Sequence, residues 1–305
     1  MKTLLCFGLG YSARRYIADH GAAYDRVIGT SRYSGADPAG TGARGREIEI
    51  LVFDGITVSA ELTAALGSAD RILVSIPPSP VGDPVLSACG KQLASLPRLQ
   101  SIVYLSTIGV YGDHAGADVD ETTLPAPLSP RSHARLAAER AWQDLGTRVG
   151  CPVAILRLAG IYGPGRNTLI KLIEGRAMRI VSPQQVFNRI HVADVAQVID
   201  AAFAQGADGI FNVADEEPCA AADIIVFAAG LMGIEPPPAI KLCEAQTLMS
   251  ARARRFYSER KRVAPAKLKK QLGVRLIYPT YRHGLRALHA AGDHNIRARS
   301  DAVIR

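Results

Sequence analysis

Cysteine, acidic side chains and long apolar runs are all scarce in this sequence. The five cysteines among 305 residues are odd in number and far apart. Such a scattered set predicts neither a disulfide framework nor a zinc site, and it is typical of proteins in a reducing compartment. No stretch reaches the roughly 18 apolar residues of a membrane span, and the start MKTLLCFGLG lacks a signal-peptide cleavage site after it. We therefore expect a cytoplasmic protein without a membrane segment or a metal.

Acidic residues are outnumbered, because 28 Asp and Glu stand against 36 Lys and Arg, which gives a formal net charge of +8. An excess of this kind can serve a nucleic-acid partner or an acidic ligand. Much of it lies between Arg252 and Arg275, so it can equally be one solvated face. Charge alone leaves these alternatives open.

Apolar runs alternate with helical patterns through the first half of the chain, which is typical of a parallel sheet covered by helices on both faces. Six successive strands are predicted by TLLCFGLG, RVIGTSR, EIEILVFD, RILVSIPP, SIVYLSTIGVYG and PVAILRLAGIYGPG. After residue 165 the pattern loosens, although GIFNVAD predicts a late strand after a long helix. The fold class predicted is α/β, with a doubly wound parallel sheet of the Rossmann type.

The first predicted strand leads into a glycine turn and then a helix. The turn follows the pattern G-x-G-x-x-A, in which the first glycine permits a tight turn, the second lets a pyrophosphate approach, and the small third residue packs closely. Amides at the helix N-terminus complete an anion site. The residues predicted to bind a dinucleotide here are Gly8, Leu9, Gly10, Tyr11, Ser12 and Ala13. The alternative is a glycine turn without a ligand.

The end of the second strand indicates which dinucleotide binds. An acidic residue there would bind the ribose 2′-hydroxyl of NAD, but the sequence has Ser31 and Arg32. A hydroxyl and a guanidinium suit a 2′-phosphate, so NADP(H) is preferred over NAD(H), unless Arg32 is only a surface residue. Asp54, after the third strand, is placed to meet the adenine or to cap a loop.

Several segments together resemble the extended short-chain dehydrogenases/reductases, the NAD-dependent epimerase/dehydratase family. In chain order they are FGLGYSA, VYLSTIGVYGD, VDETTLP, AAERAW, LRLAGIYGPGRN, NRIHVADVA, FNVADEEP and RVAPAKLKKQLGVRLIYPTYRHGL. The resemblance implies a Rossmann domain over 1–165, completed by 188–215, and a smaller C-terminal substrate domain made of 166–187 and 216–290. Residues 291–305 are expected to be a poorly ordered polar tail. The basic segment 252–275 is then structural or faces the substrate, and no nucleic-acid partner is expected.

Proton chemistry in this family uses a Ser or Thr, a Tyr, and a Lys four residues after the Tyr. Thr107 matches the Ser/Thr position, and counting back from AAER puts Arg131 at the Tyr position and Arg135 at the Lys position. Arginine keeps its proton near neutral pH, so Arg131 is expected to bind an anionic or carbonyl group of the substrate. Arg135 can still hold the cofactor ribose. The replacement acids considered are Tyr111, His133, His114 and Asp113. Thr107 and Tyr111 are the candidate catalytic residues.

Two further residues are predicted to contact the substrate. Arg166 follows the GIYGPG segment, where it could also face water, and His191 lies in RIHVADVA, where it could instead join the two domains. The remaining predicted cofactor contacts follow strand ends, where such sheets bind ligands. They are Ile76, Pro77, Ser106, Leu158, Ala159 and Gly160.

Two functions remain open from the sequence. In the first, the chain is an oxidoreductase or epimerase for a small substrate, anionic or nucleotide-linked, with a carbonyl or hydroxyl group. In the second, it is an NADP(H)-binding sensor or interaction protein without turnover. Family members often form homodimers through helices that flank the cofactor domain, and LAAERAW is a candidate face.

Overall fold

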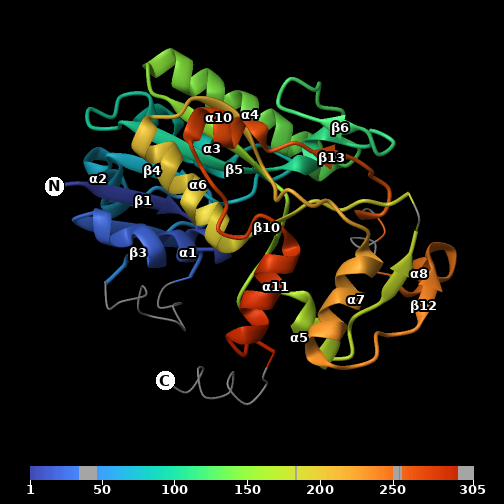
Figure 1. Ribbon diagram of the computed structural model, residues 1–305. Helices are drawn as coiled ribbons and strands as arrows, with labels where there is room; N and C mark the ends of the chain where they lie inside the picture. Colours follow the sequence, from blue (N-terminus) through green and yellow to red (C-terminus); the bar gives the residue numbers. More distant parts are fainter. Residues whose placement is uncertain (34–46, 183, 250–253, 255, 295–305) are drawn as a thin grey trace.

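The structure, a computed structural model, describes residues 1–33, 47–182, 184–249, 254 and 256–294. Its centre is a seven-stranded parallel sheet in the order β11-β7-β5-β4-β1-β2-β3 (Figure 1). The strand bounds are β1 Thr3–Phe7, β2 Arg26–Ser31, β3 Glu49–Val52, β4 Arg71–Val74, β5 Ser101–Thr107, β7 Val153–Leu158 and β11 Gly209–Val213. The strand order reverses between β1 and β4, so the carboxyl edge of these two strands is where a sheet of this type binds ligands.

Helices cover both faces of this sheet, which confirms the doubly wound arrangement. One face carries α1 (Tyr11–His20), α6 (Val192–Gln205) and α10 (Ala266–Leu272). The other carries α2 (Ala60–Ser68), α3 (Pro84–Leu93) and α4 (Pro130–Val149). Each face therefore has its own apolar core, which explains why the central strands are apolar along their whole length.

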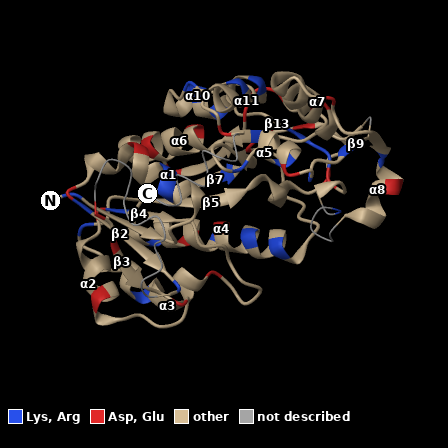
Figure 2. Cartoon of the chain, turned by 90° about the horizontal axis from the view of Figure 1, so that it is seen from below, with Lys and Arg blue, Asp and Glu red and all other residues tan. Residues whose placement is uncertain are grey.

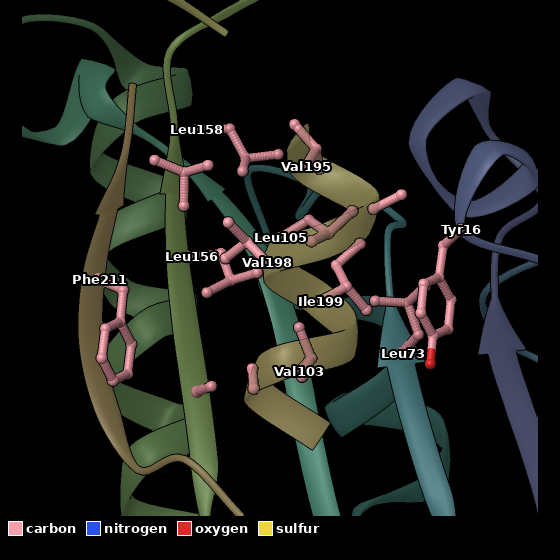
Figure 3. Packing of buried hydrophobic residues seen from close by; sticks show 14 of the residues in the cluster. Tyr16, Leu73, Val103, Leu105, Leu156, Leu158, Val195, Val198, Ile199 and Phe211 are labelled. Carbon is pink, nitrogen blue, oxygen red and sulfur yellow. The ribbon is translucent and has the colours of Figure 1, made fainter. Parts of the chain in front are cut away.

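The packing of α6 on the sheet is shown in Figure 3. Val198 and Ile199 of the helix meet Leu105 of β5 and Leu156 of β7, and Tyr16 of α1 closes the side of the cluster. The helix begins where His191 Nδ1 accepts the amide of Ala193. It ends at Gly206, whose φ of 56° is a left-handed conformation that suits glycine.

A smaller body lies beyond the carboxyl edge of the sheet. α5 (Thr168–Ile173), α7 (Ala221–Met232) and α11 (Tyr281–Ala290) share one apolar cluster. α8 (Leu242–Leu248) packs beside the parallel pair β9 (Arg179–Val181) and β12 (Ala239–Lys241). Two short pairs connect this body to the sheet: β8 (Gly160–Tyr162) with β10 (Arg189–His191), and β6 (Asp118–Val119) with β13 (Arg262–Val263).

Three expectations about these elements differ from the structure. The sixth predicted strand is two strands, because Ala159 N–H bonds Val213 O while Gly160 N–H bonds Asn188 O and directs β8 to another partner. Helix α10 falls in the expected substrate portion, yet Leu268 packs in the core of the large sheet. Residues 291–294 of the expected polar tail form an ordered turn, and residues 295–305 lie outside the described part of the chain.

Helix α4 is docked on the sheet by a buried ion pair. Ser129 caps the helix and Pro130 opens it, as their preferences predict. Two turns further, Glu139 accepts from Arg157 Nη2 of β7 at 2.7 Å and from the Ser106 hydroxyl of β5. The two charged side chains are 1% and 2% exposed. The face of LAAERAW that holds Ala138, Glu139 and Trp142 is thus buried within the chain and cannot serve a homodimer.

Several basic side chains of the segment 252–275 bond to other parts of the same chain. Lys261 Nζ donates to Gly112 O at 2.7 Å, and Lys267 Nζ donates to Ile210 O at 2.6 Å. Lys269 pairs with Glu216 at 2.5 Å. Figure 2 marks Lys and Arg positions in blue, and several of them lie on α10 and α11. These contacts fit the structural role expected for 252–275, of which residues 252, 253 and 255 lie outside the described part. Among the described residues, no helix has the length and apolar character needed to cross a bilayer.

The buried ion pair gives a stability prediction. Glu139→Gln should lower the free energy of unfolding by about 3–5 kcal/mol, because it leaves the Arg157 charge buried without a counter-charge. Urea unfolding followed by circular dichroism measures the loss. Asp19→Asn, which breaks the more exposed Arg15–Asp19 pair, is the matched control and should cost less than about 1 kcal/mol. Equal losses for the two variants would show that the pair does not hold α4.

Candidate functional site

The glycine turn is held in place at the point where the strand order reverses. Gly8 has a φ of 90°, which glycine adopts without strain. Its amide donates to Thr30 Oγ1 at 3.0 Å, and its carbonyl accepts from Ser75 Oγ at 2.7 Å. A Cβ on Gly8 would stand 2.9 Å from Ile76 Cγ1. The turn is therefore locked between β2 and β4.

The N-terminus of α1 is open beside this turn. Gly10 caps the helix without a side chain, and the first turn carries no acidic residue. A Cβ on Gly10 would meet only Ser75 Oγ, at 3.9 Å, whereas Ser12 and Ala13 are buried against the sheet. Open space, helix amides and the absence of negative charge in this turn fit the diphosphate of a dinucleotide. Gly8, Leu9 and Gly10 would hold it through the backbone.

The ends of β2 and β3 stand on one side of the turn. Ser31 is half-buried at the end of β2, and Arg32 is exposed directly after it. Asp54 follows β3, where its carboxylate accepts the amides of Ile56 and Thr57 at 2.8 and 2.7 Å. These hydrogen bonds, that from Thr57 first, lower the pKa of Asp54. Asp54 is thus a loop cap, the alternative that its position left open.

The ends of β4 and β7 stand on the other side. Ile76 is half-buried against Gly8, and Pro77 is exposed. Leu158 and Ala159 are 6% exposed, and the amides of Ala159 and Gly160 already bond Val213 O and Asn188 O. These residues shape the carboxyl edge, but Ala159 and Gly160 have no amide left for a cofactor.

Thr107 lies beside the first turn of α4, as the register of that helix predicts. Its hydroxyl accepts the amide of Gly109 at 3.1 Å. A Cβ on Gly109 would be 3.4 Å from both Thr107 Oγ1 and Ser132 Oγ, so the strand end and the helix start meet at this point. Arg131, next to Ser132, is exposed on the same turn.

Three expected site residues have other tasks in the structure. Tyr111 is fully buried, donates its hydroxyl to Asn212 Oδ1 at 2.8 Å and lies under the Arg157 guanidinium. Burial raises its pKa, which is the wrong direction for a proton donor. Ser106 bonds Glu139 rather than facing a ligand. Arg135 is 8% exposed, and its Nη1 donates to Leu105 O at 2.7 Å and to Tyr104 Oη at 3.2 Å.

His191 and Arg166 lie near the glycine turn rather than far along a substrate cleft. His191 is 2% exposed, and burial lowers its pKa to about 4, so its ring is neutral. The guanidinium of Arg166 lies 5.8 Å from the ring centre of Tyr11, the first residue of α1. Within the described residues, no group of three or more His, Cys, Asp or Glu side chains could hold a metal ion.

Comparison with known proteins agrees with this arrangement. Residues 82–214 match the model of the NAD dependent epimerase/dehydratase family. A functionally unknown conserved protein from Silicibacter pomeroyi DSS superposes with a TM-score of 0.84 at 42% identity, over 96% of this chain and 99% of that one. Over residues 82–214, the chain is therefore similar to the NAD-dependent epimerase/dehydratase family.

Other similar proteins are more distant. Protein YeeZ of Escherichia coli K12 is 30% identical over 57% of this chain, and the match spans 63% of YeeZ, less than two thirds of its length. A dTDP-glucose 4,6-dehydratase from Bacillus anthracis, solved in complex with NAD, has a TM-score of 0.76 at 16% identity over 97% of each chain. That likeness shows the shared fold.

Sequence reasoning missed the residues that hold the candidate site together. Thr30 and Ser75 fix the glycine turn from two neighbouring strands. Glu139 and Arg157 fix α4. The sequence could have indicated a buried ion pair at Glu139, because this charged residue falls on the apolar face of a helix. Its partner on β7 could be identified only from the fold.

Two buried carboxyl groups lie where the sheet meets the smaller body. Asp194 accepts the amides of Ile277 and Tyr278, and burial raises its pKa to about 6. Asp215 is 1% exposed and accepts the amide of Glu217 at Oδ1, while its Oδ2 has no hydrogen-bond partner among the described residues. Burial raises the pKa of Asp215 to about 7, so ionisation of this carboxyl opposes folding.

A pH prediction follows from Asp215. A pKa raised in the folded state contributes stability at low pH that is lost as the pH rises toward about 7. Asp215→Asn removes this loss. The free energy of unfolding of the variant, measured relative to that of the parent, should therefore rise by up to about 1.4 kcal/mol per pH unit between pH 5 and 7. His191 and Asp194 are present in both proteins; the charge of Asp194 contributes to the raised pKa of Asp215, so this coupling is part of the measured difference.

Urea unfolding at pH 5, 6, 7 and 8 measures this difference. Asp54→Asn is the matched control, because the pKa of Asp54 is lowered and its ionisation is complete over this range. Its difference from the parent should not change with pH. A flat difference for Asp215→Asn as well would contradict the assignment.

Proposed function

We propose that this chain is an NADP(H)-dependent oxidoreductase or epimerase that acts on a small anionic or nucleotide-linked substrate with a carbonyl or hydroxyl group. The observation that carries the proposal is the glycine turn at the β1–β4 edge, locked by Thr30 and Ser75 and open at Gly10. The family and the backbone donors at α1 support a nicotinamide dinucleotide.

The preference for NADP(H) rests on the end of β2. Ser31 and Arg32 stand there in place of an acidic residue, and Arg32 is exposed. A guanidinium can bind a 2′-phosphate through two parallel hydrogen bonds, whereas it gains little from a ribose hydroxyl. The bound nicotinamide would supply hydride transfer to or from the substrate carbon, and the chain would orient the reacting groups.

The substrate side is assigned to the first turn of α4. Thr107 would orient a substrate oxygen, because it stands at the end of β5, close to the first turn of α4. Arg131, exposed one residue before Ser132, would bind a carboxylate or phosphate of the substrate. The dTDP-glucose dehydratase with this fold supports a nucleotide-linked substrate as the first class to test.

The cofactor preference has a direct test. Arg32→Ala should weaken NADPH binding by about 1.5–3 kcal/mol and leave NADH binding nearly unchanged, because only NADPH offers the 2′-phosphate. Isothermal titration of parent and variant with each cofactor measures both affinities. If the parent binds the two cofactors equally well, the preference is wrong.

Gly10→Val is the negative control for the site itself. A valine would occupy the open space at the start of α1 and exclude the diphosphate of either cofactor, yet it meets no protein backbone. Gly67→Ala, where a Cβ meets nothing within 4 Å, is the matched change elsewhere. Both variants should unfold like the parent, while only Gly10→Val loses binding.

A second candidate function is cofactor binding without turnover. The specific observation in its favour is that Tyr111 is buried on Asn212, while arginines stand at positions 131 and 135. NADPH oxidation followed by absorbance, against a panel of carbonyl compounds and nucleotide sugars, separates the two. We expect turnover of at least one anionic or nucleotide-linked substrate; tight NADPH binding with no turnover across the panel would favour the second function.

A further inference from the structure

The loop from Gly163 to Asn167 lies against the N-terminus of α1. Tyr11 donates its hydroxyl to Pro164 O at 2.8 Å. Gly163 and Arg166 exchange two backbone hydrogen bonds, at 3.1 and 3.0 Å, which makes the turn tight. The guanidinium of Arg166 then stacks over Tyr11, 5.8 Å from its ring centre. A cation thus stands beside the helix end that is open for an anion.

Asp293 forms hydrogen bonds with this loop. Its carboxylate accepts the amide of Gly165 at 3.1 and 3.0 Å and the Asn167 side-chain amide at 2.5 Å. Asn167 also donates to Gly163 O and caps α5 through Ile170 N. The carboxylate of Asp293 is therefore held in place by hydrogen bonds from the loop, while its charge and that of Arg166 act on Tyr11 in opposite directions. Among the described residues, no carboxylate forms an ion pair with the Arg166 guanidinium, which lies over the Tyr11 ring.

An unpaired donor under the same loop is a second sign of a ligand. His191 accepts the Ala193 amide at Nδ1, so the neutral ring carries its proton on Nε2. This Nε2 is buried, and within the part of the chain that the structure describes it has no hydrogen-bond partner. It lies 3.4 Å from the point that a Cβ on Gly163 would occupy, and Tyr11 Oη lies 2.7 Å from that point. Buried donors usually have an acceptor, so this corner fits a bound polar group.

We propose that Arg166 is a ligand of the diphosphate of the bound dinucleotide, and that the loop 163–167 roofs the N-terminus of α1. This rests on the proposed function and reassigns Arg166 from the substrate to the cofactor. A diphosphate at Gly10 would meet helix amides on one side and the Arg166 guanidinium on the other. Asp293 is a positioning residue, because it fixes the loop that carries Arg166.

The test uses both cofactors in the absence of substrate. Arg166→Gln removes the charge but keeps a polar chain, and it should weaken NADPH and NADH binding equally, by about tenfold each, since both carry the diphosphate. Arg166→Lys should recover part of the loss. Arg32→Ala, by contrast, should affect NADPH alone. Arg176→Gln, beyond the other end of α5, removes an exposed arginine paired with Glu174 and should change neither affinity.

Salt dependence gives a readout that a purely structural role would not change. The affinity of Arg166→Gln for NADH should decrease less steeply with rising salt than that of the parent, because one phosphate contact is lost. Asp293→Ala should have the same effect, and the double variant should bind no more weakly than Arg166→Gln alone.

Two outcomes would overturn the inference, and they are distinguishable. If the parent binds neither cofactor, the proposed function fails together with this site. If the parent binds and Arg166→Gln binds both cofactors as tightly, Arg166 does not contact the diphosphate. In that second case a raised KM for an anionic substrate would return Arg166 to the substrate side.

Discussion

The ion pair between Glu139 and Arg157 is the constraint on which the placement of α4, and with it the substrate side of the candidate site, depends. It joins α4 to β7 in a region from which water is excluded. Two charges in such a region must stay together, because separating them leaves each one desolvated and unpaired. An apolar helix face could shift along the sheet at little cost, but this pair fixes the register of α4. Arg131 and Arg135, two turns and one turn before Glu139, are placed by it.

The same pair explains which contacts Tyr111 makes in the structure. Arg157 lies 4.7 Å from the centre of the Tyr111 ring, and the phenol reaches Asn212 on the next strand. Ser106, Arg157 and Asn212 are neighbours across β5, β7 and β11. A line of polar groups inside the sheet must satisfy its own hydrogen bonds, and Tyr111 is used for that purpose. The contacts of Tyr111 with Arg157 and Asn212 therefore give this residue a structural role.

Local patterns could be predicted from the sequence, and long-range pairings could not. The glycine turn, the cap of α4 and the register of that helix follow from residues that are close in the chain. The break between β7 and β8 is invisible locally, because both halves are extended and apolar; it arises from the different partners of Ala159 and Gly160. Tyr11 and Pro164 are 153 positions apart, so no local pattern could have placed Arg166 beside α1.

The cofactor side and the substrate side of the candidate site are formed by different kinds of group. The cofactor side consists mainly of backbone groups, whose positions the strand order and two hydroxyls at Thr30 and Ser75 determine. The substrate side depends on individual side chains on α4, where one replacement changes the chemistry while the helix stays docked through Glu139. Dinucleotide binding and turnover are therefore separable properties of this fold. Binding alone tests the first side only, and the identity of the group that moves the proton has to be established from the substrate side.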